Sequence, residues 1–173
     1  MYKRKILLIL INLSFLCASL KYDSVNVGIS ESLGVFGLIS MDFKLSNISN
    51  ENDVFYFTMG TLPLPIFGGA GFTYKKYFNI FEIDPILNTF IKPYVSTTIF
   101  SSYIMGPSDS PAKTYIMGTL GFGADFSIIK INTTSINIQT GVFTQYNFSE
   151  GEIFESPSDQ PEIWPAINIK ISQ

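Results

Sequence analysis

The chain has 173 residues, a length that suits a single domain. Charged residues make up only 14% of it and aromatic residues 15%, whereas soluble domains carry roughly 25% charged residues. Beyond the N-terminus, no stretch holds the roughly 18 uninterrupted apolar residues that a membrane-spanning helix needs. This composition leaves two classes of protein, a densely packed β protein and a membrane β-barrel.

The first 19 residues have the three parts of a secretory signal peptide. Basic residues at positions 3–5 precede the apolar segment 6–16, and Cys17-Ala18-Ser19 offers small residues for cleavage before Leu20. A lipoprotein signal with an acylated Cys17 is the alternative, although the bulky Leu16 stands where such signals usually have a small residue. Both routes predict an exported protein.

Cleavage after Ser19 removes the only cysteine and the only arginine of the chain. The basic residues then fall from 11 to 8 against 14 acidic ones, so the net charge changes from −3 to −6. The mature chain has no thiol for a disulfide bond. Because binding to nucleic acid depends on phosphate neutralisation by basic side chains, nucleic acid is not expected as a partner.

Eight segments of the mature chain alternate between apolar and polar residues, which is the period of a β-strand. They span residues 24–30, 35–46, 54–62, 69–78, 91–103, 115–129, 135–148 and 163–172. Residues 47–52 and 132–133 predict turns, 79–88 a longer connection with room for a helical turn, and 105–112 and 149–162 long loops. Connections without intervening helices favour antiparallel neighbours in up-and-down order.

The sixth segment, YIMGTLGFGADFSII, shows the alternation most clearly. Its apolar face carries Ile116, Gly118, Leu120, Phe122, Ala124, Phe126 and Ile128. Its other face carries Tyr115, Met117, Thr119, Gly121, Gly123, Asp125 and Ser127. The open question is whether the apolar face points into a protein core or out into lipid.

The polar faces of the segments favour the second answer. They carry mostly Gly, Ser, Thr, Asn and Gln, whereas the water-facing side of a soluble barrel carries charged residues along its strands. Small uncharged groups suit the crowded interior of an eight-stranded barrel. The sequence therefore predicts an all-β fold over residues 20–173, an up-and-down antiparallel eight-stranded transmembrane β-barrel.

This pattern resembles the small eight-stranded outer-membrane β-barrel proteins of diderm bacteria. The resemblance covers the mature chain and rests on the periodicity, the signal peptide and the final strand WPAINIKISQ. It implies that the protein lies in the cell outer membrane, in contact with outer-membrane lipid. A periplasmic or secreted location is the alternative.

Five charged residues fall on the inward faces of their strands: Asp42, Lys44, Lys75, Asp125 and Lys170. Because an unpaired buried charge costs several kcal/mol, these residues predict an ion-pair network that fills the lumen, with the lysines bridging Asp42 and Asp125. A narrow ion path lined by the same residues is the alternative. Three aromatic residues close strands just before loops and predict an interfacial girdle, with an ordinary core as the alternative: Tyr103, Tyr146 and Phe148.

The sequence offers little catalytic chemistry, because the absence of histidine removes Ser-His-Asp and Cys-His catalysis and the commonest metal ligand. We predict no enzyme activity, no cofactor and no metal site. The loop before the last strand carries an acidic patch formed by Glu150, Glu152, Glu155 and Asp159. It predicts either a solvated loop or a surface that binds a cation or an extracellular protein partner.

These observations predict a non-enzymatic outer-membrane β-barrel protein whose surface loops serve adhesion or partner contact. Two alternatives stay open at this point. One is a small ion channel on the same fold, and the other is a soluble exported β-barrel that binds an apolar ligand in its interior.

Overall fold

The computed structural model describes residues 20–33, 38–61, 67–84, 89–104, 113–148 and 162–172. Within these ranges the chain forms nine strands: β1 (Leu20–Ile29), β2 (Ile39–Leu45), β3 (Asp53–Thr61), β4 (Phe67–Tyr77), β5 (Phe81–Asp84), β6 (Thr89–Ile104), β7 (Lys113–Ile131), β8 (Thr134–Asn147) and β9 (Glu162–Ser172). No helix in the described part of the chain is long and apolar enough to cross a membrane.

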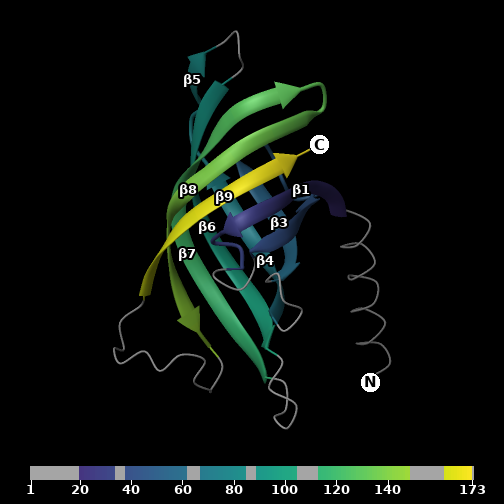
Figure 1. The fold of residues 1–173 in the computed structure, drawn as a ribbon, viewed down its shortest axis with the longest axis vertical. Helices are drawn as coiled ribbons and strands as arrows, with labels where there is room; N and C mark the ends of the chain where they lie inside the picture. The colour runs from purple at the N-terminus through teal and green to yellow at the C-terminus, as the bar shows by residue number, and fades with distance from the viewer. Residues whose placement is uncertain are drawn as a thin grey trace.

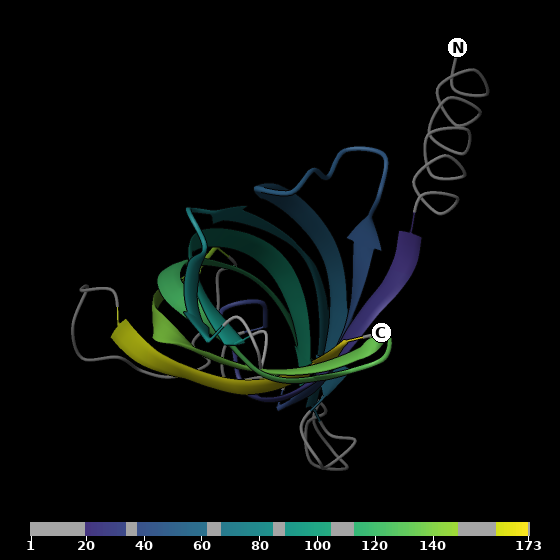
Figure 2. The same ribbon diagram turned by 90° about the horizontal axis from the view of Figure 1, so that it is seen from above.

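Eight of these strands close into an antiparallel barrel (Figures 1 and 2). Strands that follow each other in the chain pair with each other, except that β4 pairs with β6, from Phe67↔Ile104 to Tyr77↔Tyr94, and not with β5. The pairing of β1 with β9 closes the ring. The predicted fold class, an all-β, up-and-down, eight-stranded barrel, is confirmed. The first and last strands of the barrel, β1 and β9, lie side by side because they pair with each other.

The remaining strand, β5, lies outside the closed ring. Its presence shows that one prediction was wrong. Residues 79–88 were expected to form a connection with room for a helical turn, yet β5 pairs with the start of β6 through Phe81↔Ile91 and Glu82↔Phe90. Figure 1 shows this short hairpin projecting beyond the rest of the barrel. Alternating apolar and acidic residues in FEID suit an exposed strand, but four residues are too few to stand out as a period.

The two ends of the barrel differ in their connections. We call the tight-turn end the one that holds the turn at residues 46–52 and the two-residue turn between β7 and β8. In that second turn Asn132 has φ 54°, a left-handed conformation that asparagine tolerates better than most residues. The opposite end, which we call the long-loop end, receives the connections that follow β1, β3, β6 and β8.

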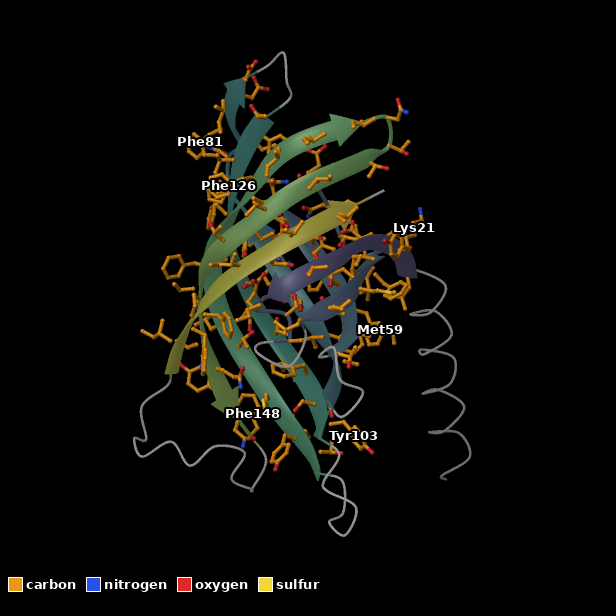
Figure 3. The ribbon with its side chains drawn as sticks, in the orientation of Figure 1. Lys21, Met59, Phe81, Tyr103, Phe126 and Phe148 are labelled. Atoms are coloured by element: carbon orange, nitrogen blue, oxygen red, sulfur yellow. The ribbon has the colours of Figure 1, made fainter. Side chains whose placement is uncertain are left out.

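Side chains along each strand alternate between the inside and the outside of the barrel. On β7, Tyr115, Met117 and Thr119 are buried, whereas Ile116 is 51% exposed, Leu120 59% and Phe122 65%. In Figure 3, Met59, Phe81 and Phe126 project away from the barrel. The apolar face of the strands is therefore on the outside, and the polar face lines the interior.

Glycines make room where inward-facing side chains crowd the interior. Gly123 and Gly141 stand opposite each other on β7 and β8. A Cβ on Gly123 would lie 2.9 Å from the hydroxyl of Tyr94, and a Cβ on Gly141 would lie 2.8 Å from the Cα of Gly123 and closer still to the carbonyl oxygen of Phe122. These glycines lie within strands, as their sequence context predicts, and the close contacts explain why they are needed there.

We expect Gly141→Ala to lower the free energy of unfolding by about 1–3 kcal/mol, because the added methyl group meets backbone atoms that cannot move aside. Gly68→Ala is the matched control, since a Cβ there meets only the Gly60 carbonyl oxygen at 3.6 Å, an ordinary contact. Urea unfolding followed by tryptophan fluorescence measures both variants. Equal midpoints for the two would contradict the steric argument.

Candidate functional site in the barrel lumen

Charged and tyrosine side chains gather in the lumen toward the tight-turn end. We call this group the lumen cluster: Glu31, Asp42, Tyr56, Lys75, Tyr77, Tyr94, Asp125 and Lys170. Each member is at most 8% exposed. The cluster draws on the strands β2, β3, β4, β6, β7 and β9, and on the segment that follows β1. Such a group is stable only when its charges are paired and its polar atoms are hydrogen-bonded.

Lys75 lies at the centre of the first group of contacts. Its Nζ lies 2.5 Å from Oε1 of Glu31, and both side chains are 2% exposed. The same ammonium stands 4.5 Å from the ring centroid of Tyr94, and the hydroxyl of Tyr94 donates a hydrogen bond to Oε2 of Glu31 at 3.3 Å. The carboxylate, the ammonium and the tyrosine therefore form a closed triangle that joins β4, β6 and residue 31.

Lys170 forms the second ion pair, with Asp23. Nζ lies 2.7 Å from Oδ2 of Asp23, donates a hydrogen bond to the hydroxyl of Tyr56 at 3.4 Å and lies 4.8 Å from the centroid of that ring. The register of β1 against β2 shifts between Tyr22 and Ser24. This irregularity explains how Asp23 reaches a lumen lysine although its neighbour Ser24 also faces inward.

Asp42 and Asp125 are held by neutral donors. Oδ1 of Asp42 accepts a hydrogen bond from Thr58 at 2.6 Å. Asp125 accepts one from the hydroxyl of Tyr77 at 3.0 Å and another from Nε2 of Gln139 at 2.8 Å. Hydrogen bonds to a carboxylate are among the stronger ones in proteins, and they offset part of the cost of burying the two charges.

Four of the five charged residues chosen from the sequence are buried in the lumen: Asp42, Lys75, Asp125 and Lys170. The fifth, Lys44, is half-buried and lies at the rim. The expected partners were wrong, because the ion pairs in the described residues join Lys75 to Glu31 and Lys170 to Asp23 rather than to Asp42 and Asp125. Glu31 lies between strands and Asp23 at a register shift, so strand periodicity gave no signal for either.

The lumen opens at the tight-turn end into a cavity of about 530 Å³. Charged residues and tyrosines line much of it, among them Lys44, Tyr56, Tyr77, Lys92 and Asp125. Nζ of Lys92 donates a hydrogen bond to the backbone carbonyl of Glu51 at 2.9 Å and stands 4.4 Å from the ring centroid of Tyr77. The cluster is thus reached by solvent from this end.

Two further groups of predicted residues have different outcomes. Tyr103, Tyr146 and Phe148 are 40%, 42% and 65% exposed on the outer wall, and Figure 3 shows Tyr103 and Phe148 near the long-loop end. The ring of Phe148 covers Gly118 of β7, where a Cβ would lie 2.7 Å from the ring. The acidic patch at residues 150, 152, 155 and 159 lies outside the described residues, as do the signal peptide and the loop 105–112.

Among the described residues no group of three or more Asp, Glu, Cys or His side chains is arranged to hold a metal ion. Comparison of the chain with protein-family models, curated proteins and solved structures finds no match. The barrel and its lumen are therefore the basis for a functional argument.

Proposed function

We propose that this protein is a non-enzymatic β-barrel of the outer membrane of a diderm bacterium. Its wall contacts lipid, its lumen is closed by side chains, and its long loops face the cell exterior and contact a partner. The observation that carries the proposal is the inverted polarity of the barrel, with charged residues inside and large apolar residues outside.

The outer wall is apolar along most of its surface. Ile99 of β6, Phe122 of β7 and Ile167 of β9 are each more than 60% exposed. In contrast, the charged Asp42, Lys75 and Asp125 face inward with less than 10% exposure. In water, contiguous apolar patches on monomers rarely exceed a few hundred Å². A lipid environment accounts for this wall without a partner protein.

Aromatic residues mark both ends of the wall. Four outward rings follow one another across β1 to β4, from the tight-turn end at Tyr22 and Phe43 to the middle of the wall at Phe57 and Phe72, with adjacent centroids 5.3–6.4 Å apart. Tyr103, Tyr146 and Phe148 lie near the other end. Membrane barrels carry aromatic girdles at both interfaces, where an amphipathic ring meets the headgroups.

The lumen favours this proposal over an interior site for an apolar ligand. An apolar ligand needs a mostly apolar cavity, whereas the interior here contains two ion pairs and the hydrogen-bonded carboxylates of Asp42 and Asp125. Desolvating these charges against an apolar molecule would cost several kcal/mol. We therefore assign function to the loops and not to a ligand inside the barrel.

We assign partner contact to the acidic loop that precedes β9. The residues 149–161 carry four of the 14 acidic residues of the chain, so a basic partner surface on another cell or molecule would be attracted. Because β1 begins and β9 ends at the tight-turn end, the loops 105–112 and 149–161 join strands at the opposite end, which faces outward in barrels with an even number of strands. The connection that contains β5 lies at the tight-turn end.

Fractionation of the native cells tests the location. We expect the protein to stay in the outer membrane after a carbonate wash, to migrate differently on gels before and after boiling, and to be cut on intact cells only within residues 105–112 or 149–161. A protein that washes free in the periplasmic fraction would refute the proposal. Cleavage on intact cells at the turn 46–52 would invert the orientation.

A further inference from the structure

The segment that follows β1 lies inside the barrel. Residues 30–33 are almost completely buried, with Glu31 1% and Leu33 0% exposed. They come from the long-loop end, yet the Glu31 side chain reaches Lys75 and Tyr94 in the lumen cluster. Figure 2, which looks down on the ring of strands, shows this segment within the ring. It therefore occupies the path between the long-loop end and the cluster.

Polar contacts hold the segment to three strands. Glu31 is paired with Lys75 of β4, accepts a hydrogen bond from Tyr94 of β6, and accepts a second one on its backbone carbonyl from the hydroxyl of Thr119 on β7. These contacts are all made by side chains of the wall. The hydrogen bond from the amide of Gly28 to the carbonyl of Leu38, at 2.8 Å, extends the pairing of β1 with β2 up to the base of the segment.

Leu33 supplies an apolar contact with the adjacent strands β3 and β4. A Cβ built on Gly60 of β3 would lie 2.8 Å from Cδ1 of Leu33, and a Cβ on Gly69 of β4 would lie 3.6 Å from Cδ2. The two glycines face each other in the β3–β4 ladder. Because neither glycine has a side chain, they leave space for the leucine, and we call this space the glycine seat. The side chain of any larger residue at position 60 would fill it.

The inner wall carries buried small polar side chains, interspersed with large ones such as Phe100, which is 1% exposed between Thr98 and Ser102 on β6. Ser40, Ser96, Thr98 and Ser102 are at most 2% exposed. The hydroxyl oxygens of Ser40, Ser96 and Ser102, together with the amide oxygens of Asn26 and Asn168, have no hydrogen-bond partner among the described residues. Buried polar atoms normally have partners, ordered water included, so these oxygens indicate room for water in the lumen.

We propose that residues 30–33 are a displaceable stopper, and that the lumen conducts small hydrated ions when the stopper leaves its seat. This inference rests on the proposed membrane location. Among the described residues, side chains hold the segment through one ion pair, two hydrogen bonds and one apolar contact, and a bridge at Ser30 joins its first residue to the sheet. The ladders of β1 end at Ile29, so residues 31–33 can leave without breaking them. The path then runs past the buried serines and threonines of β2 and β6 and the lysines and aspartates of the cluster to the open cavity at the tight-turn end.

Two substitutions each remove one contact of the stopper, either the ion pair or the apolar contact. Glu31→Gln removes the ion pair with Lys75, and Leu33→Ser removes the apolar contact with the glycine seat. The matched controls are Glu82→Gln on β5, which is exposed, and Ile48→Ser in the turn after β2, where the isoleucine is 55% exposed. Both controls change the same chemical groups away from the stopper.

The measurement is single-channel current through planar bilayers in potassium chloride, with protein purified from the membrane fraction. We expect the wild type and both controls to be closed most of the time. We expect Glu31→Gln and Leu33→Ser each to raise the open probability by roughly tenfold or more, because removal of one partner of a buried pair is strongly destabilising.

The outcomes separate this inference from the proposed function. Both stopper variants must first show the heat-modifiable migration of a folded barrel, and Leu33→Ala provides a milder third variant for this purpose. The stopper would be refuted if the folded stopper variants had the same low open probability as the wild type. It would also be refuted if the wild type had an open probability as high as that of the variants. A protein that never enters bilayers would instead refute the membrane location itself.

Discussion

Replacing Lys75 with methionine is expected to lower the free energy of unfolding of the barrel by about 3–5 kcal/mol, the usual effect of removing one partner of a buried ion pair. The lysine is 2% exposed and its ammonium lies between the Glu31 carboxylate and the Tyr94 ring. Methionine keeps most of the side-chain volume, so the loss measures the charge and not a cavity. Urea unfolding of the protein in lipid vesicles gives the midpoint and the slope.

The next residue along the chain is the matched control. Lys76 is on the same strand but faces outward, is 51% exposed, and lies 3.7 Å from Oδ1 of Asp53. Exposed pairs of this kind contribute about 0–1 kcal/mol, so Lys76→Met should leave the midpoint almost unchanged. Similar losses for the two lysines would mean that the lumen is hydrated well enough to make the ion pair unimportant.

The double variant Glu31→Gln/Lys75→Met tests whether the two charges act as a pair. Removing both should restore part of the stability lost in either single variant, because no uncompensated charge is left in the lumen. The double-mutant cycle isolates the pairwise energy. Additive losses in the cycle would show that Lys75 is stabilised mainly by other members of the cluster.

Strand alternation predicted most of this barrel because a two-residue period assigns every side chain of a strand to one of two faces. It placed Lys75, Asp125 and Lys170 on the inward face, where the structure has them. It failed for Leu45, which alternation puts on the outer wall but which is 3% exposed at the end of β2, where the chain turns away.

The partners of the lumen charges could not be predicted in the same way. Glu31 lies in a segment without alternating residues, and the position of that segment depends on the contact of Leu33 with Gly60 of β3 and Gly69 of β4. Asp23 depends on a local register shift in β1. Periodicity identifies a face of one strand, whereas these contacts are decided by which strands close the ring and by where the chain departs from regular pairing.

The two ends of the lumen have different roles in this arrangement. At the tight-turn end, the 530 Å³ cavity gives solvent access to Asp125 and Lys92. At the other end, Glu31 and Leu33 cover the same cluster. Buried ion pairs add little net stability over apolar side chains of the same volume. Their presence in a lumen that apolar residues could have filled therefore favours a functional reason for the charges.

Placing an arginine at Phe122 is expected to prevent assembly of the barrel in membranes. Phe122 is midway along β7 and is 65% exposed on the outer wall. An arginine at the midplane of the lipid-facing wall costs about 2–4 kcal/mol. For a β-barrel in water, the same substitution at an exposed site would change stability by about 0.5 kcal/mol or less, and it would improve solubility. The two environments therefore predict opposite results for one residue.

Thr133→Arg is the control, because residue 133 is exposed in the turn between β7 and β8, beyond the end of the wall. We expect the heat-modifiable, membrane-bound fraction in cells to fall severalfold for Phe122→Arg and to stay at the wild-type level for Thr133→Arg. Normal yield of folded Phe122→Arg, recovered without detergent, would mean that water covers this wall. The apolar face would then have to be explained by a protein partner, since Ile116, Leu120 and Phe122 form a run of exposed apolar residues along one strand, and soluble monomers rarely expose large contiguous apolar patches.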